Sequence, residues 1–369
     1  MSPIPLVDLS AQHEAVADEV ADGWQEVLNR AAFVGGAPVK AFEREFADFS
    51  GIQHCVGVAN GTDAIEIALR ALDIGAGDEC ILPANTFIAT AEAVARAGAT
   101  PVLVDCASDG SYLIDVDAVA AAVTPATRAI VPVHLYGQAA PLEQLRPIAE
   151  TFGGWIVADA AQAQGARRNG SPVSVLADLA ATSFYPGKNL GAYGDAGAVL
   201  TGSADLAERA RMIADHGARR KYQHEVFGFN SRMDALQAVV LSAKLRRLAQ
   251  WNASRRAAAD RYQDLLAGLD EVITPRTLPG NEHVWHLYVV RVPNRDQVLK
   301  ELQAAGIGAG IHYPVPIHLA PAFAGLGCPE GSFPVTEQAA GQLLSMPLFA
   351  EITAGQQARV ADALTSALR

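Results

Sequence analysis

The sequence predicts an α/β protein whose large domain holds a mostly parallel sheet covered by helices on both faces. Three observations favour this fold class. From about residue 50 to 245, short apolar runs alternate with segments of helical spacing. A long helical segment without internal proline follows, and a mixed strand and helix pattern completes the chain. Alternating strands and helices are typical of a parallel sheet, and 369 residues, half of them hydrophobic, suffice for a large domain and a smaller one.

The predicted elements follow in chain order. The apolar runs that we interpret as strands are HCVGVAN, ECILPAN, TPVLVD, RAIVPVHLYG, WIVADAAQ, LAATSFYP and AGAVLTG, and TDAIEIALRAL and PLEQLRPIAETFG have helical spacing. A helix from about Arg232 through Leu269 is predicted to connect the domains. We therefore expect a large domain over residues 1–245, including an N-terminal arm, and a small α+β domain over 246–369. The small domain has strand-like HLYVVRV and IGAGIHYP, followed by two helical patterns.

The charge of the chain excludes some classes of function. The net charge is -12, which disfavours general nucleic-acid binding because that binding depends on Lys and Arg against phosphates. The chain shows no signal-peptide pattern and no apolar run long enough for a membrane span, so we expect a soluble, cytoplasmic protein without a membrane partner. No CxxC or HExxH pattern occurs, and no metal site is expected.

Lys188 occupies the most informative position among the five lysines. Lys40, Lys244 and Lys300 lie in charged helical patterns, where a solvated helix face explains them. Lys188 instead follows the apolar strand LAATSFY, within SFYPGKNLGAYGDAG. Loss of hydration at such a strand end lowers a lysine pKa from about 10.4 and makes the neutral amine available as nucleophile and base. An ordinary loop lysine is the alternative.

A second chemical feature is the carboxylate that ends the buried strand WIVAD. Asp159 in this position is suited to holding the protonated ring nitrogen of pyridoxal 5′-phosphate (PLP), which needs a carboxylate partner to act as an electron sink. Gln162, three residues later, lies within reach of the ring oxygen. A helix N-cap aspartate is the alternative for Asp159.

The third feature is a turn suited to a phosphate. CVGVANGTDAIEIALRAL reads as strand, turn and helix, so the N–H groups of Gly61 and Thr62 would lie at a helix N-terminus, which favours an anion. Neither GxxxxGK[ST] nor GxGxxG occurs here. Phe87 follows the next strand and suits stacking on a flat cofactor, with a core aromatic as the alternative. Ser183, five residues before Lys188, is a further phosphate donor or a buried strand residue.

These features occur within motifs that extend along nearly the whole chain. The motifs are VDLSAQ, NGTDA, VPVHLYGQ, DAAQAQGA, SFYPGKNLG, YGDAGAV, GFNSRMDALQA and HYPVPIHL. In them the chain resembles the DegT/StrS-type nucleotide-sugar aminotransferases, which share the aspartate aminotransferase fold (PLP fold type I). The combination of SFYPGKNLG and DAAQAQGA is highly specific to that family.

The resemblance implies a role for each residue of the pocket. Asn230 in GFNSR would reach the phosphate from a neighbouring subunit, which implies a homodimer with shared active sites. Lys188 would bind PLP covalently and carry the proton, Asp159 would pair with the pyridine nitrogen, Gln162 would contact the 3′-oxygen, Phe87 would stack on the ring, and Gly61, Thr62 and Ser183 would hold the phosphate.

The same resemblance indicates a substrate. The nearest subgroup acts on the 3-keto carbon of dTDP-linked 6-deoxyhexoses. One departure is visible, because the chain has Gly-Ala-Arg at 217–219 where the family pattern has Gly-Ser-Arg. Tyr185, His312 and Tyr313 would face the sugar, and the basic run Arg219, Arg220 and Lys221 would bind the diphosphate, with a solvated loop as the alternative for that run.

The expected activity is transfer of an amino group from L-glutamate to a keto-sugar, with pyridoxamine phosphate as the intermediate form of the cofactor. Alternatives are a C4 or UDP-sugar aminotransferase and a regulatory protein that keeps the fold without catalysis. A PLP sugar dehydrase is disfavoured because such enzymes have histidine in place of the lysine that binds PLP, whereas this chain has Lys188. An NAD-dependent oxidoreductase is disfavoured because the glycine-rich fingerprint is missing.

Overall fold

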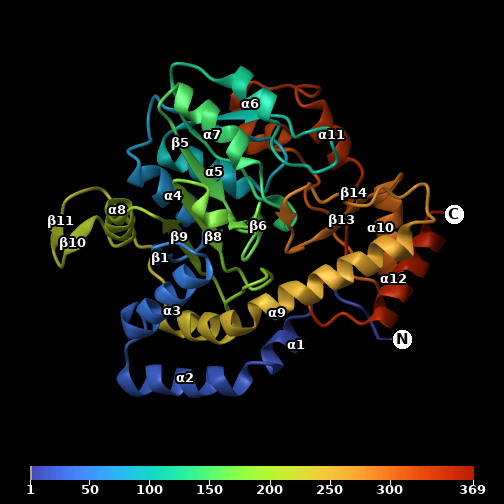
Figure 1. Cartoon of the computed structure of the whole chain (residues 1–369), viewed down its shortest axis with the longest axis horizontal. Coiled ribbons are helices and arrows are strands. Elements are labelled where there is room, and N and C mark those ends of the chain that lie inside the picture. Colours follow the sequence, from blue (N-terminus) through green and yellow to red (C-terminus); the bar gives the residue numbers. More distant parts are fainter. Residues whose placement is uncertain (1) are drawn as a thin grey trace.

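The computed structural model describes residues 2–369 and has a seven-stranded sheet at its centre (Figure 1). The strand order is β1-β9-β8-β5-β4-β2-β3, and only β9 runs against its neighbours β1 and β8. Each predicted strand of the large domain is therefore confirmed. The strands are β1 (His54–Val58), β2 (Glu79–Pro83), β3 (Thr100–Val104), β4 (Thr127–Ile130), β5 (Trp155–Asp159), β8 (Leu179–Ser183) and β9 (Gly197–Thr201).

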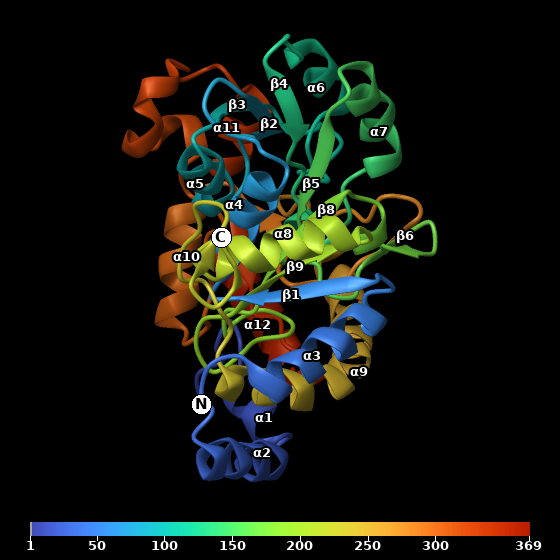
Figure 2. The ribbon, with the colours of Figure 1, turned by 90° about the vertical axis from the view of Figure 1, so that its left-hand side faces the viewer.

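Helices cover both faces of this sheet (Figure 2). Side chains alternate along each strand, so Ile156 and Ala158 join one apolar cluster and Val157 joins the other. The first cluster contains residues of α3 (Gly36–Phe49), α6 (Val116–Ala122) and α7 (Leu142–Thr151), and the second contains residues of α4 (Gly61–Ala71), α5 (Ile88–Ala97) and α8 (Ala204–Ala214). The arrangement matches a parallel sheet buried on both faces.

A 32-residue helix, α9 (Ala235–Leu266), crosses the molecule to the C-terminal part (Figure 1). This confirms the predicted long helix. Its last turns pack with a two-stranded sheet and two helices in a third apolar cluster. These elements are β13 (Tyr288–Arg291), β14 (Leu343–Met346), α10 (Arg295–Ala304) and α12 (Ala354–Ala367).

The N-terminal arm lies against this C-terminal cluster. Ile4 is buried in it, and the backbone N–H of Gly308 donates to the carbonyl of Ile4 at 2.7 Å. Two helices, α1 (Leu9–Glu14) and α2 (Ala17–Arg30), follow the arm. The division of the chain at residue 245 stays a prediction.

Two smaller differences from the sequence-based expectation concern the edges of the molecule. IGAGIHYP is not a strand, because it forms only two isolated bridges, Ile307 with Ile4 and Gly310 with Ser345. A hairpin of β10 (Ala218–Arg220) and β11 (Gln223–His224) extends away from the sheet at the left of Figure 1. The remaining strands and α-helix are β6 (Arg167–Arg168), β7 (Ser171–Pro172), β12 (Asn281–Glu282) and α11 (Pro334–Ala340).

Candidate active site

One cavity of about 580 Å³ lies where the carboxyl ends of β5 and β8 meet the starts of α4 and α5. The carboxyl edge of a parallel sheet is where ligands bind in such folds. The structure brings nine of the residues predicted from the sequence to the lining of this cavity. They are Gly61, Thr62, Phe87, Asp159, Gln162, Ser183, Tyr185, Lys188 and Tyr313.

The start of α4 forms the anion-binding end of the cavity. The side chain of Asn60 caps this helix by accepting the N–H of Asp63 at 2.8 Å, and not the N–H of Gly61 or Thr62. Their N–H groups have no partner within the helix. A Cβ atom at Gly61 would lie 2.5 Å from the Cβ of Ser183, so glycine is what allows the helix to approach β8. The N-terminus of α4 and the hydroxyls of Thr62 and Ser183 together suit a phosphate.

Asp159 is buried at the end of β5 with both carboxylate oxygens in hydrogen bonds. The backbone N–H of Ala161 donates to Oδ1 at 3.0 Å, and the hydroxyl of Thr90 donates to Oδ2 at 2.7 Å. Burial raises the pKa of this carboxyl, whereas the hydrogen bonds from Thr90 and Ala161 and the charge of Lys188 lower it. A carboxylate in this setting is suited to a cationic partner rather than to water.

Lys188 lies in the loop after β8, with its backbone N–H donating to the carbonyl of Tyr185 at 2.8 Å. Loss of hydration lowers the pKa of its amine to about 8, and the opposing charge of Asp159 limits the fall. His286 and His312 also face this amine, and burial holds the pKa of each well below 6.5, to about 4 for His312. The amine is therefore partly neutral near pH 8 and available as a nucleophile.

A group of aromatic and amide side chains closes the other side of the cavity. The amide of Gln162 accepts the backbone N–H of Tyr136 at 2.6 Å and donates to the hydroxyl of Tyr313 at 2.9 Å. The ring of Phe87 is about half exposed and its centroid lies 5.4 Å from that of Tyr313. A large aromatic exposed inside a cavity is suited to stacking on a planar ligand.

Five of the predicted residues do not line this cavity in the single chain. The ring nitrogen Nδ1 of His312 lies 2.7 Å from the hydroxyl of Ser345, so this side chain is directed toward β14. Asn230 is exposed and accepts a hydrogen bond from the side chain of Arg232 at 3.2 Å. The basic run Arg219, Arg220 and Lys221 belongs to the exposed β10–β11 hairpin, where Arg219 forms ion pairs with Glu208 and Glu225.

The structure corrects the interpretation of Lys244 and adds a residue that the sequence did not indicate. Lys244 is 2% exposed rather than on a solvated helix face, and its amine donates to the carbonyl of Gly191 at 2.8 Å, which holds the loop after Lys188. Helical spacing within α9 gave no signal of this, because the partner loop is distant in sequence. Thr90 was also missed, since its bond to Asp159 joins residues 69 positions apart.

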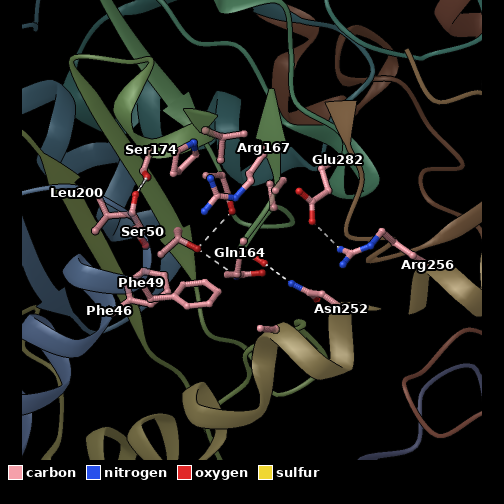
Figure 3. A pocket seen from close by; sticks show the side chains of 18 residues that line it. Phe46, Phe49, Ser50, Gln164, Arg167, Ser174, Leu200, Asn252, Arg256 and Glu282 are labelled. Carbon is pink, nitrogen blue, oxygen red and sulfur yellow. Dashed lines mark hydrogen bonds and ion pairs between the residues drawn. The ribbon is translucent and has the colours of Figure 1, made fainter. Parts of the chain in front are cut away.

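A second cavity, of about 210 Å³, lies behind the segment that follows Asp159 (Figure 3). Gln164 fixes this segment, because its amide donates to the carbonyl of Ser183 at 2.7 Å and its carbonyl accepts from Asn252 at 2.9 Å. Arg256 and Glu282 form an ion pair of 3.2 Å at its edge. The residues around this second cavity therefore hold the segment that follows Asp159 in place, and the cavity itself is separate from the one that Lys188 lines.

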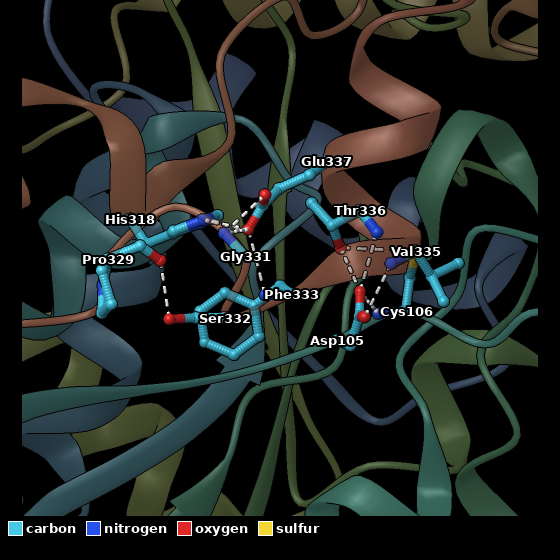
Figure 4. A network of polar contacts seen from close by, with 10 residues as sticks. All are labelled: Asp105, Cys106, His318, Pro329, Gly331, Ser332, Phe333, Val335, Thr336 and Glu337. Atoms are coloured by element: carbon cyan, nitrogen blue, oxygen red, sulfur yellow. Dashed lines mark hydrogen bonds and ion pairs between the residues drawn. The ribbon is translucent and has the colours of Figure 1, made fainter.

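A polar network attaches the segment after Tyr313 to the large domain (Figure 4). The hydroxyl of Thr336 donates to Asp105 at 2.7 Å, and Asp105 also accepts the backbone N–H of Val335 at 2.9 Å. Glu337 lies 2.9 Å from Nε2 of His318. These bonds join α11 to the end of β3 and α11 to His318, and so hold the segment that follows Tyr313.

The three features of the cavity fit one cofactor. PLP carries a phosphate, a carbonyl carbon and a ring nitrogen, and the cavity offers a helix N-terminus, an amine with a lowered pKa and a buried carboxylate. No group of three or more His, Cys, Asp or Glu in residues 2–369 is arranged to hold a metal ion. The fold and the site thus define a PLP-dependent enzyme of fold type I.

Comparison with known proteins supplies the family. The chain belongs to the DegT/DnrJ/EryC1/StrS aminotransferase family, whose model matches residues 15–365, and its cofactor is PLP. It is 46% identical to the dTDP-3-amino-3,4,6-trideoxy-alpha-D-glucose transaminase of Streptomyces venezuelae, over 98% of this chain and 95% of that protein. It is 44% identical to a UDP-N-acetyl-3-dehydro-alpha-D-glucosamine 3-aminotransferase of Acidithiobacillus ferrooxidans, over 99% and 98%.

A solved structure extends this similarity to the whole fold. The crystal structure of S. venezuelae DesV in complex with a ketimine intermediate has a TM-score of 0.97 to this chain, with 45% identity and full coverage of both chains. The chain is therefore an aminotransferase. Within residues 2–369, no helix combines the length and the apolar composition that a membrane crossing requires.

Proposed function

We propose that this aminotransferase moves the amino group of L-glutamate to the C3 keto group of a dTDP-linked 6-deoxy-keto-hexose, which yields a dTDP-aminosugar. The observation that carries the proposal is a single cavity in which the amine of Lys188, the carboxylate of Asp159 and the start of α4 line the same space. The relative from S. venezuelae, named as a transaminase of a dTDP-3-amino sugar, supports the choice of nucleotide and carbon.

PLP when bound supplies an electron sink that accepts the electron pair of a broken C–H bond and carries the amino group between substrates. Lys188 attaches the cofactor. Once the amino substrate has displaced it from the cofactor, its amine moves one proton at a time. The lowered pKa of about 8 lets this amine act as base and acid near neutral pH. Asp159 holds the proton on the ring nitrogen. Gly61, Thr62 and Ser183 bind the phosphate, and Phe87 and Gln162 orient the ring.

The complete site requires a second subunit. Asn230 and the basic residues of the β10–β11 hairpin are exposed and do not line the cavity of their own chain. The hairpin extends from the body of the molecule (Figure 1), and the segment that follows β11 carries Phe227, which is 98% exposed. A homodimer in which each hairpin reaches the neighbouring cavity would bring Asn230 to the cofactor phosphate and cations to the sugar diphosphate.

The sugar would lie against the aromatic side of the cavity. Tyr185 is 58% exposed at the cavity, and the hydroxyl of Tyr313 is held by Gln162. Arg220 and Lys221 from the partner hairpin would bind the diphosphate. A guanidinium group can donate two parallel hydrogen bonds to phosphate oxygens, and the lysine adds a positive charge. His312 would act behind Tyr313 rather than on the sugar, since it is directed toward Ser345.

A UDP-linked 3-keto sugar is the second candidate substrate, favoured by the 44% identity to the relative from A. ferrooxidans. The test is an incubation of the holoenzyme with L-glutamate and either a dTDP-3-keto-6-deoxyhexose or a UDP-linked 3-keto sugar, followed by mass spectrometry of the nucleotide sugars. We expect an aminosugar from the dTDP substrate and 2-oxoglutarate in equal amount. If only the UDP substrate yields an aminosugar, the nucleotide of the substrate is UDP and the proposal of dTDP is wrong. No aminosugar from any keto-sugar would contradict the proposed function.

A further inference from the structure

The carboxylate of Asp159 is held by a residue from a different element. Thr90 is fully buried in the first turn of α5, and its hydroxyl lies 2.7 Å from Oδ2. The same helix start carries Phe87 as its N-cap. One turn of α5 therefore places both an aromatic ring in the cavity and a hydrogen-bond donor on the buried carboxylate.

When Asp159 is ionised, the number of protons fixes the direction of the hydrogen bonds in this group. A threonine hydroxyl has one proton, and Thr90 gives it to Asp159. The hydroxyl of Thr86, 3% exposed and 3.0 Å away, must then donate to Thr90. The series of hydrogen bonds from Thr86 to Thr90 to Asp159 ends on Oδ2 of the carboxyl group. The N–H of Ala161 donates to the other oxygen, Oδ1. Both oxygens therefore accept hydrogen bonds, and this arrangement suits the ionised carboxylate, which has no proton to donate.

This arrangement counteracts the effect of burial. Burial alone raises the pKa of Asp159, and the hydrogen bond from Thr90 is the largest influence that lowers it. The other titratable groups that face the carboxylate are the amine of Lys188 and the hydroxyl of Tyr313, and burial raises the pKa of that hydroxyl well above 10. Hydrogen bonds to an ionised group stabilise the charged form and fix its orientation.

We propose that Thr90, oriented by Thr86, is a positioning residue that keeps Asp159 ionised and directed at the ring nitrogen of PLP. The inference rests on the proposed role of Asp159. It predicts that the hydroxyl of Thr90 acts on the cofactor without touching it, because the carboxylate that it holds must keep the ring nitrogen protonated throughout the reaction.

The chain offers a matched control for the test. Thr336 is also fully buried and also donates to an aspartate, Asp105, at 2.7 Å, but this pair joins α11 to β3 and does not line the cofactor cavity (Figure 4). Thr336→Val and Thr90→Val therefore remove the same type of bond at similar burial. A loss common to both variants reports on folding, and a loss specific to Thr90→Val reports on the cofactor.

The experiment measures two quantities on full-length protein: the dissociation constant for PLP, and the ¹⁵N chemical shift of bound PLP labelled at the pyridine nitrogen, each from pH 6 to 9. Loss of a hydrogen bond to a charged group weakens PLP binding by about ten- to a hundredfold in Thr90→Val. We expect the ¹⁵N shift of this variant to move toward that of an unprotonated ring nitrogen across this pH range, because a more basic Asp159 carboxylate draws the proton from the ring nitrogen to itself. Thr90→Ser should restore both quantities, and Thr86→Val should move them less in the same direction.

The outcomes separate this inference from the proposed function. Wild-type values in Thr90→Val, or equal changes in Thr90→Val and Thr336→Val, would overturn the role of Thr90 while the aminotransferase assignment stands. If Thr90→Val does not fold, the comparison of Thr86→Val and Thr90→Ser with the wild type decides the same question. A wild-type protein whose bound PLP has an unprotonated ring nitrogen would overturn the role of Asp159 and, with it, that of Thr90.

Discussion

The amine of Lys188 should titrate near pH 8 in the cofactor-free protein. Burial lowers its pKa and the charge of Asp159 raises it, and two imidazoles held neutral by burial, His286 and His312, also face it. For an ordinary lysine, about 0.03% of the amine is neutral at pH 7, whereas a pKa of about 8 makes roughly a tenth neutral, a gain of about 300-fold in reactive amine. This gain would appear directly in the rate at which the protein captures PLP.

The assay is stopped-flow absorbance of PLP capture by the cofactor-free protein between pH 6 and 10, with a soluble lysine derivative as the reference for ionisation of PLP itself. The rate should rise with pH and level off above about pH 9. The perturbation is Asp159→Asn, which removes the negative charge that raises the pKa of Lys188, so the midpoint should fall below that of the wild type.

Two other titratable groups near this amine titrate far from pH 8. The pKa of His312 is lowered to about 4 and that of Tyr313 is raised well above 10, so neither group accounts for a midpoint near 8. A wild-type midpoint near 10, or a midpoint that rises in Asp159→Asn, would refute the proposed environment of Lys188.

Three further predictions follow from the same contacts. Gly61→Ala should weaken PLP binding severalfold in an absorbance titration, because the added Cβ would lie 2.5 Å from the Cβ of Ser183; unchanged binding would place the phosphate elsewhere. Lys244→Met should lower the free energy of unfolding in urea by about 1–3 kcal/mol, since a buried carbonyl loses its donor, and an unchanged midpoint would contradict this. Co-refolding equal amounts of Lys188→Ala and Asn230→Ala should restore about a quarter of wild-type activity, because half of the dimers would be mixed with one intact site each. Activity no higher than that of the separate variants would contradict shared sites.

Much of the fold could be predicted because it depends on local patterns. The seven apolar runs became the seven strands of the central sheet, and the uninterrupted helical pattern became α9. IGAGIHYP was wrongly predicted as a strand, because its apolar residues pack between elements without forming a ladder. Strand pairing requires a partner edge, and one sequence does not reveal where that edge lies.

The residues of the site that lie at the ends of strands could be predicted from the sequence. Lys188 and Asp159 follow β8 and end β5, so their meeting at one edge of the sheet follows from parallel topology. The bond from Thr90 to Asp159 and the burial of Lys244 were not predictable, since both depend on contacts between elements far apart in sequence. The proposed place of Asn230 beside the cofactor phosphate requires a second subunit, and no pattern within one chain positions that subunit.

The most direct test of the central claim is the visible absorption spectrum of the holoenzyme before and after addition of L-glutamate, with Lys188→Ala as the control. We expect L-glutamate to convert the band of bound PLP to that of pyridoxamine phosphate with release of one 2-oxoglutarate per site. Lys188→Ala should make this conversion at a rate lower by several orders of magnitude. A wild-type spectrum that L-glutamate and other amino acids leave unchanged, or conversion by Lys188→Ala at the wild-type rate, would contradict the claim.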